Sequence, residues 1–355
     1  MRSSFYHNKR IFITGHTGFK GSWLCRALAK FGAIITGYAQ PNGGNTNLYS
    51  LCSLDNIVSS KYGDIRDFDN LYQSIKIFEP EIVIHLAAQP LVRLSYQEPS
   101  TTYEINVMGT VNILECVRQL DCVKSFLNVT TDKVYTNNEW PWGYREEDRL
   151  GGLDPYSSSK SCSELITQSY VNAFFEKQRL PVSTARAGNV IGGGDFSLDR
   201  IVPDFIKAAE RCEALVVRNP FSTRSYQHVL DVLGAYLLII EKQYNDPSLA
   251  GAYNIGPEDS NCVTTAHLAD LLCSAWGSKP WVNQYEEGPH ESHYLKLDCS
   301  KTKQVFKWKP IWDISKAVKE TVRWYKIHYN KDDTDITRLM DEQIEEYFEH
   351  VREYE

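Results

Sequence analysis

The residue types and the spacing of Tyr156 and Lys160 suggest a role in catalysis. They stand four apart in PYSSSKSCSELI, which places both on one face of a helix that opens after Pro155. A tyrosine is a poor base near neutral pH, but a neighbouring lysine ammonium stabilises the phenolate and lowers its pKa. The same lysine can hydrogen-bond a nicotinamide ribose. The alternative is an ordinary surface pair, so this reading needs support from elsewhere in the chain.

The stretch SFLNVTTDKVYTNN places Thr131, Asp132 and Lys133 at the end of an apolar run. Oxidation of an alcohol can use Thr131 with Tyr156 and Lys160, but it gives no reason for the adjacent acid and base. A 4-keto sugar would use them. Its C5 proton is acidic, so a base can remove it while an acid protonates the departing C6 hydroxyl. We assign Asp132 the acid and Lys133 the C5 base; the reverse assignment and a solvated turn stay open.

A glycine loop precedes these residues near the N-terminus. In TGHTGFKGSWL, Gly15, Gly18 and Gly21 fit G-x-x-G-x-x-G between an apolar strand and an amphipathic helix. The first glycine permits a tight turn, the second lets backbone N–H groups approach a pyrophosphate, and the third lets helix and strand pack closely. The strand–turn–helix context favours a dinucleotide site over an ordinary turn.

The elements that must position these residues alternate along the first half of the chain. Apolar runs predict strands at 10–15, 33–39, 81–88 and 123–131, and helical patterns predict helices at 21–32, 71–80 and 102–119. This alternation is typical of βαβ units around a parallel sheet. We expect an α/β fold: a Rossmann-type doubly wound parallel sheet with a smaller mixed α/β C-terminal lobe.

The domain boundaries follow from where the alternation loosens. We expect residues 1–186 to form the dinucleotide-binding domain, with a return segment at about 226–256. Residues 187–225 and 257–355 would form the substrate lobe and the C-terminal tail. The tip of the second strand, GYAQPNGGN, carries neither an acid nor an arginine, so it does not separate NAD from NADP. Asp64, in GDIRD, is either an acceptor for the adenine amino group or an N-cap.

Composition excludes several classes of protein. The net charge is −7 with both signs interspersed, so no basic block predicts nucleic-acid binding. The nine cysteines form no CxxC pair, which disfavours disulfides and zinc and suits a reducing cytoplasm. His290 and His293 are close in sequence but lack a carboxylate-rich cage, so we predict no metal. The longest apolar stretch, at 232–240, is too short for a membrane span.

Several motifs together resemble the CDP-glucose 4,6-dehydratase family, extended-type members of the short-chain dehydrogenase/reductase superfamily that hold NAD. They are GHTGFKGSWL, LAAQPLVRLSY, NVMGT, TDKVY, EWPWGYRE, DPYSSSK, ARAGNVIGGGDF, RNP, QHVL and HESHYLKLDCSK, between about Arg10 and Trp324. The related dTDP-glucose dehydratases carry Asp-Glu where this chain carries Asp132-Lys133. The resemblance implies 4,6-dehydration of a nucleotide hexose in deoxysugar and O-antigen biosynthesis.

The resemblance also implies binding residues, each with a structural hydrogen bond or ion pair as its alternative. Besides Tyr156 and Lys160, the implied cofactor contacts are Gly15, His16, Thr17, Gly18, Phe19, Lys20, Gly21, Asp64, Ile65, Leu86, Ala87, Ala88, Gln89, Asn106 and Arg186. The implied substrate contacts are Gln89, Asn189, Arg218, Arg224, Glu291 and Tyr294. Arginine suits the diphosphate because its guanidinium binds phosphate bidentately.

Two other functions compete with a dehydratase. A nucleotide-sugar 4-epimerase would share the glycine loop, Tyr156 and Lys160, but has no use for Asp132 and Lys133. A non-catalytic dinucleotide-binding regulator would have no reason to combine Thr131 with the Tyr–Lys pair. A dehydratase acting on another nucleotide hexose also stays open. The resemblance implies a homodimer in which helices at about 102–119 and 156–175 pack as a four-helix interface.

Overall fold

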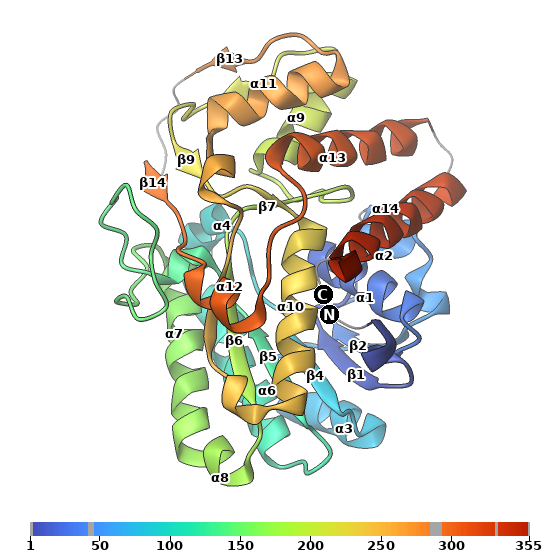
Figure 1. Cartoon of the computed structure of the whole chain (residues 1–355), viewed down its shortest axis with the longest axis vertical. Helices are drawn as coiled ribbons and strands as arrows, with labels where there is room; N and C mark the ends of the chain where they lie inside the picture. The colour runs from blue at the N-terminus through green and yellow to red at the C-terminus, as the bar shows by residue number, and fades with distance from the viewer. Residues whose placement is uncertain (1–2, 42–45, 285–292, 331–332, 354–355) are drawn as a thin grey trace.

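A parallel sheet forms the centre of the protein (Figure 1). The computed structural model describes residues 3–41, 46–284, 293–330 and 333–353. In these residues the seven-stranded sheet has the order β11-β6-β5-β4-β1-β2-β3. Its strands are β1 (Arg10–Thr14), β2 (Ile34–Ala39), β3 (Ser59–Tyr62), β4 (Ile82–His85), β5 (Ser125–Val129), β6 (Val182–Ala187) and β11 (Ala252–Ile255). Every neighbouring pair is parallel, which confirms the predicted doubly wound fold.

Helices cover both faces of the sheet. Successive side chains along each strand point to opposite faces, and both sets are buried. Phe12, Val83 and Phe126 face one core, while Ile11 and Leu127 face the other. The first core is covered by α3 (Phe68–Phe78), α6 (Gly109–Arg118) and α7 (Pro155–Tyr170), and the second by α1 (Phe19–Lys30), α10 (Val229–Asn245) and α14 (Asp333–Glu353).

The order of the strands reverses between β1 and β4. The chain runs outward through β2 and β3, crosses back through α3, and places β4 on the other side of β1. Such a switch point opens a crevice at the carboxyl ends of the two strands, which is where open α/β sheets bind ligands. The strand predicted at 81–88 ends earlier, at His85, because Leu86 and Ala87 instead pack against Gly15.

The helix predicted at 102–119 contains a π-helical turn. It runs as α5 (Pro99–Tyr103), η3 (Glu104–Met108) and α6. A second π turn, η5 (Val171–Phe175), extends α7 into α8 (Glu176–Gln178). Single π turns within α-helices often lie at functional sites, and Asn106 lies in η3. Shorter helical turns are η1 (Ser3–Tyr6), α2 (Leu48–Leu51), η2 (Leu54–Asn56), α4 (Val92–Gln97), η4 (Asp132–Val134), η6 (Pro247–Leu249) and η7 (Asp259–Asn261).

A smaller part with short strands lies at one end of the sheet (Figure 1). Its strand pairs are β7 (Val190–Ile191) with β10 (Gln227–His228), β8 (Val216–Val217) with β13 (Val282–Asn283), and β9 (Thr223–Arg224) with β12 (Val263–Thr264) and β14 (Tyr294–Leu295). Its helices are α9 (Ile201–Glu210), α11 (Thr265–Trp276) and α13 (Ile314–Tyr329). The short helix α12 (Ser300–Phe306) instead packs beside β11 of the large sheet.

The C-terminal helix α14 returns to the Rossmann part. Arg26 of α1 contacts Asp341 at 2.6 Å, and the side chains of Ile336 and Met340 are fully buried. The tail is therefore part of the second core. Its apolar positions, spaced three and four apart, are the ones that α1 and α10 cover.

Candidate active site

The glycine loop has the geometry of a phosphate cradle. Gly15 has φ +72°, and a Cβ there would come within 2.7 Å of the backbone nitrogen of Ala87. A Cβ on Gly21 would come within 2.3 Å of the carbonyl oxygen of Gly15, so this glycine permits α1 to pack directly on the loop. Gly18 caps α1 without a side-chain hydrogen bond. The helix N-terminus thus faces the crevice with backbone N–H groups, which suits an anion.

The side chains of His16 and Lys20, both in this loop, lie in different surroundings. The imidazole of His16 is buried, lies 3.0 Å from the hydroxyl of Ser60, and has its pKa lowered to about 4 by burial. Lys20 lines the main cleft, where burial and then the nearby cations Arg200 and Lys160 lower its pKa to about 7. Thr17 is buried, and Phe19 lines the cleft beside Lys20.

The segment after β4 forms the other wall of the crevice. Leu86, Ala87 and Ala88 are half-buried, and the N–H groups of Leu86 and Ala87 both lie 3.2 Å from the hydroxyl of Thr14. The amide of Asn106 clamps both backbone groups of Gln89, at 2.8 and 3.1 Å.

Asn106 also donates to the hydroxyl of Ser159 on α7 at 2.9 Å. The side chain of Gln89 bonds to Leu91 and Thr102, so protein groups hold its amide. Asn106 therefore connects the crevice wall to the helix that carries Tyr156.

Asp64 and Ile65 lie at the far end of the crevice, after β3. Asp64 accepts from Arg66 at 2.7 Å and from Gln40 at 2.7 Å, and the hydrogen bonds with Arg66 lower its pKa to about 2. The N-cap of α3 is Asp67, so the alternative of Asp64 as that cap is wrong. Ile65 is buried against Gly109.

Tyr156 and Lys160 meet the end of β5 at a cleft of about 510 Å³, the size of a small-ligand site. Tyr156 lines the cleft and hydrogen-bonds the side chain of Thr131. Lys160 is buried and donates to the carbonyl oxygen of Val129 at 2.9 Å. Burial lowers the pKa of Lys160 to about 8, while Glu164 raises it.

The pKa of Tyr156 is raised, whereas the sequence predicted a lowered pKa. Burial raises it to about 12, and the hydrogen bond with Thr131 and the charge of Arg200 only partly offset this effect. The prediction of a lowered pKa was wrong because spacing shows the neighbouring lysine but not the depth of the phenol. A buried phenolate loses its hydration, which favours the protonated form.

Asp132 and Lys133 lie beside Thr131 with different exposure. The carboxylate of Asp132 is 1% exposed, and its Oδ1 accepts from the Thr131 hydroxyl at 2.9 Å and from Lys133 at 3.4 Å. Among the described residues its Oδ2 has no hydrogen-bond partner. This oxygen lies near Gly188, a lining residue of the cleft, while Lys133 lines the cleft directly. The pair therefore offers one buried acceptor and one accessible amine.

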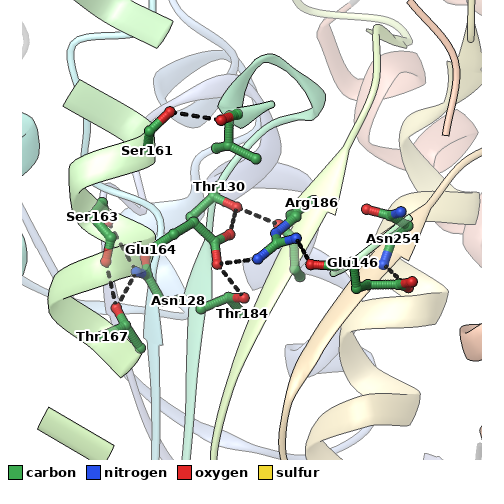
Figure 2. Close-up of polar contacts among 12 residues, drawn as sticks. Asn128, Thr130, Glu146, Ser161, Ser163, Glu164, Thr167, Thr184, Arg186 and Asn254 are labelled. Atoms are coloured by element: carbon green, nitrogen blue, oxygen red, sulfur yellow. Dashed lines mark hydrogen bonds and ion pairs between the residues drawn. The ribbon is translucent and has the colours of Figure 1, made fainter. Parts of the chain in front are cut away.

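Arg186 has protein partners that favour the structural alternative. Its guanidinium forms an ion pair with Glu164 at 2.9 Å, with both side chains at most 5% exposed. It also donates to the hydroxyl of Tyr135 and to the carbonyl oxygen of Glu146, each at 2.8 Å. Figure 2 shows the contacts of Arg186 with Glu164 and Glu146. Protein groups therefore hold the guanidinium of Arg186, which favours a structural role over a contact with the cofactor.

Most of the expected substrate residues lie around the same cleft. Asn189, Arg218 and Arg224 line it. Tyr294 lies one residue before the lining residue Leu295, and its side chain is about two-fifths exposed. Glu291 lies outside the described residues.

Sequence reasoning missed several charged residues of the cleft. Arg93 on α4 and Arg218 both pair with the Oδ1 of Asp199, at 3.5 and 3.7 Å. Arg200 pairs with Asp195 at 3.0 Å, and all of these residues line the cleft. Arg93 stands in LAAQPLVRLSY, a motif already singled out, and Arg200 comes four residues after ARAGNVIGGGDF, but neither position indicates that the side chain lines the cleft.

The part of the chain that the structure describes lacks two features. It contains no group of three or more His, Cys, Asp or Glu placed to hold a metal ion. Within the same ranges, no helix is both long and apolar enough to cross a membrane.

The sheet order, the glycine crevice and the Tyr156–Lys160 pair define a Rossmann-type protein of the extended short-chain dehydrogenase/reductase class. Residues 12–321 match the family described as GDP-mannose 4,6 dehydratase. A CDP-glucose 4,6-dehydratase from Salmonella typhimurium is 44% identical over 330 residues, covering 91% of this chain and 92% of that protein. The chain therefore belongs to the GDP-mannose 4,6 dehydratase family, and its resemblance to 4,6-dehydratases is confirmed.

Solved structures show how widely this fold is shared. A dTDP-glucose 4,6-dehydratase from Bacillus anthracis, in complex with NAD, has a TM-score of 0.78 at 24% identity, covering 91% of this chain and 98% of that one. A UDP-glucose 4-epimerase from Thermotoga maritima, with UDP-glucose, has a TM-score of 0.79 at 23% identity, covering 90% and 99%. Dehydratases and epimerases are thus equally similar in fold, so the choice between them depends on the site.

Proposed function

We propose that this protein is an NAD-dependent dehydratase that converts CDP-glucose to CDP-4-keto-6-deoxyglucose and water. The observation that carries the proposal is the position of Asp132 and Lys133. Both adjoin Thr131 at the cleft that Tyr156 lines, and the buried Oδ2 of Asp132 has no partner among the described residues. An acid and a base beside the oxidising site serve an elimination, which a 4-epimerase does not perform. The 44% identical relative supports CDP-glucose as the substrate.

The crevice between β1 and β4 fits a dinucleotide. Gly15 and Gly21 leave no room for side chains, and α1 begins at Gly18 without a side-chain cap. We propose that the loop from Gly15 to Gly21 holds the pyrophosphate, that Leu86, Ala87 and Ala88 line the cofactor, and that Asp64 and Ile65 flank the adenine. Bound NAD would supply the two-electron acceptor for the C4 alcohol and the two-electron donor that later reduces C6.

Tyr156 is the proposed base for the hydroxyl at C4. Its phenol can take that proton only after losing its own, and Thr131 and Arg200 favour the anion against the penalty of burial. A protonated Lys160 adds a positive charge at the same helix face. Thr131 holds the phenol in line with the end of β5. It also positions the sugar oxygen between its own hydroxyl and the phenol.

Asp132 and Lys133 are the proposed acid and base of the elimination. Lys133 removes the C5 proton once C4 is a ketone, because the carbanion is then stabilised as an enolate. Asp132 protonates the departing C6 hydroxyl, so one water is lost, and its Oδ2 has no other hydrogen-bond partner among the described residues. The ammonium of Lys133 lies 3.4 Å from the Asp132 carboxylate, so transfer of its proton to Asp132 would leave Lys133 neutral as the base and Asp132 protonated as the acid.

The positive side chains of the cleft suit the diphosphate. We propose that Arg218 and Arg224 bind it, with Asn189, Gln89, Glu291 and Tyr294 around the rest of the nucleotide sugar. Arg93 and Arg200 add two cations to the same wall. This local charge can attract a diphosphate although the whole chain carries −7.

We propose that the protein acts as a homodimer in the cytoplasm. Met108, Leu165 and Phe174 lie on η3, α7 and η5, and each is at least two-fifths exposed. Exposed apolar residues gathered on helices at this face favour an interface. The nine cysteines are free thiols, which suits a reducing compartment. We further propose the two-part division predicted above, with residues 1–186 and about 226–256 binding the dinucleotide.

The deciding experiment is incubation with CDP-glucose and NAD in deuterated water, without added reductant. Mass spectrometry and NMR should show loss of one water, a 4-keto-6-deoxy sugar and deuterium at C5. An unchanged mass with inverted C4 would replace the dehydratase with an epimerase. Turnover of another nucleotide hexose but not CDP-glucose would keep the reaction and correct the substrate.

A further inference from the structure

Glu164 lies at the centre of a buried polar network behind the cleft (Figure 2). Its carboxylate is 3% exposed and forms an ion pair with Arg186 at 2.9 Å. It accepts a further hydrogen bond from the hydroxyl of Thr184 at 2.7 Å and a short one from the hydroxyl of Thr130. One carboxylate on α7 therefore joins three groups from the ends of β5 and β6.

The cation in this network is anchored on its other side. Arg186 donates to Tyr135, whose hydroxyl in turn donates to Asn254 on β11 at 2.7 Å. Its second donor hydrogen-bonds the carbonyl oxygen of Glu146. Because each partner is itself held, the guanidinium has little freedom to leave Glu164, and the pair is a fixed feature of the fold.

The network touches the proposed catalytic residues on two sides. Thr130 immediately precedes Thr131, so the hydrogen bond to Glu164 holds the end of β5. Glu164 also follows Lys160 by one helical turn, on the same face of α7. Lys160 donates to the carbonyl oxygen of Val129, the residue before Thr130. Helix and strand are thus joined twice, once through the ammonium and once through the carboxylate.

We propose that Glu164 is a positioning residue of this active site: it holds Thr130 against α7 and supplies the negative charge that keeps the buried Lys160 ammonium protonated. This inference rests on the proposed function, in which a charged Lys160 assists the phenolate of Tyr156. Without a counter-charge, a buried ammonium tends to lose its proton. Arg186 carries the opposite charge, so its ion pair with Glu164 should reduce the negative charge that acts on Lys160.

Other titratable groups surround Lys160 and can also affect its pKa. They come from each element packed around it: Tyr156 and Glu164 on α7, Lys20 on α1, His85 on β4, Asp132 and Lys133 after β5, and Arg186 on β6. Of these, Glu164 is the group that raises the pKa of Lys160, while burial lowers it to about 8. Lys160 is therefore close to losing its proton near physiological pH, where a nearby charge can change its protonation.

The charges of Glu164 and Arg186 predict opposite effects on Lys160. Glu164→Gln removes the negative charge and leaves a cation, so the pKa of Lys160 should fall. Arg186→Met leaves the carboxylate, so this pKa should rise. If a protonated Lys160 is needed, the alkaline limb of the kcat/KM profile should move by roughly one pH unit in opposite directions. A purely structural ion pair would lower activity in both variants without moving the limb.

A direct measurement does not depend on turnover. Lysine labelled with 13C at Cε, with the Lys160 signal assigned by Lys160→Arg, would be titrated by NMR in both variants. Opposite shifts of that titration support the proposal; unchanged titrations, or shifts in the same direction, overturn it. If either single variant fails to fold, the double variant Glu164→Gln/Arg186→Met buries no unpaired charge and should titrate near the wild-type protein.

A matched control and a separate outcome complete the test. Glu81→Gln breaks the Lys9–Glu81 ion pair of 2.9 Å at the opposite end of the sheet and should leave the Lys160 titration unchanged. Glu164→Asp keeps the charge and should retain the alkaline limb better than the glutamine variant. Failure to turn over any nucleotide sugar would end the proposed function, whereas the NMR titration would still decide the role of Glu164.

Discussion

Thr131 donates its hydroxyl hydrogen to Oδ1 of Asp132 at 2.9 Å. The same side chain hydrogen-bonds the phenol of Tyr156 and lowers its pKa, so one hydroxyl can give its single hydrogen either to the proposed base for C4 or to the proposed acid for C6. Both bonds can form because Thr131 lies two residues after β5, at the carboxyl end of a central strand. The two proton-transfer groups therefore share a rigid support rather than a mobile loop.

Replacement of Thr131 should affect the first of these groups most. Thr131→Val removes a hydrogen bond that lowers the pKa of Tyr156, so this already raised pKa should rise further. We expect kcat to fall by roughly 10- to 100-fold at neutral pH, with a smaller deficit at higher pH. Thr131→Ser keeps the hydroxyl and should retain most activity. Equal activity of the valine variant and the wild-type protein would contradict the role of this hydroxyl.

Substitutions of Asp132 and Lys133 should separate the two halves of the elimination. Lys133→Met should abolish deuterium exchange at C5 and slow dehydration by roughly 100-fold or more, because no base removes the C5 proton. Asp132→Asn should slow loss of water while C5 exchange continues. NMR of the sugar in deuterated water distinguishes the two outcomes. If the two variants exchange these phenotypes, the acid and the base must be reassigned.

Asp199 occupies an anion position between two arginines of the cleft. Its Oδ1 lies 3.5 Å from Arg93 and 3.7 Å from Arg218, where a substrate diphosphate would compete for the same cations. Asp199→Asn should therefore tighten CDP binding by roughly 3- to 10-fold at low salt. Calorimetry with CDP measures the change, and cytidine, which lacks the diphosphate, provides the control. Weaker CDP binding would indicate that Asp199 instead holds the arginines in place.

Asp231 should make stability depend on pH. Burial raises the pKa of its carboxyl to about 7, and its Oδ1 accepts from the N–H of Ile311 at 2.7 Å. Because the folded state holds this proton more tightly, the stabilisation is complete below about pH 3.8 and is lost as pH rises towards 7. Asp231→Asn should raise the free energy of unfolding at pH 8 by roughly 2–4 kcal/mol.

Urea denaturation at pH 5 and pH 8 measures this difference. The gain from Asp231→Asn should be larger at pH 8 than at pH 5, where most of the wild-type carboxyl is already protonated. The exposed helix cap Asp313 provides a matched control, because asparagine caps a helix about as well. An equal gain at both pH values would mean that charge burial is not the cause.

The proposed dimer makes a prediction for Leu165. Its side chain is 56% exposed on α7, on the helix face expected to meet a second copy. Leu165→Glu places a charge there and should shift the protein to a monomer at micromolar concentration, because charged residues are depleted at the core of interfaces. Light scattering after size exclusion measures the mass. Lys177→Glu, at the far end of that helix in α8, is the comparison and should keep the mass of the wild-type protein.

The sequence by itself predicted the elements and most of the residues at the site. Short apolar runs alternating with helical patterns predicted parallel βαβ units, since period and length are local properties. Gly15, Gly18 and Gly21 predicted the crevice, because the turn and the close packing depend on residues without a Cβ. Tyr156 and Lys160 were predicted on one face because helical spacing alone decides that relationship.

Only the tertiary structure decided burial and long-range partners. It raised the pKa of Tyr156 through depth, turned Arg186 towards Glu164, and brought Asp199 between arginines distant in sequence. Each of these results depends on contacts between separate segments, and desolvation is a property of the whole surrounding shell. The amino-acid sequence therefore determined which chemical groups this protein carries. Folding determined which of them form ion pairs, exchange a proton or form a hydrogen bond with one another.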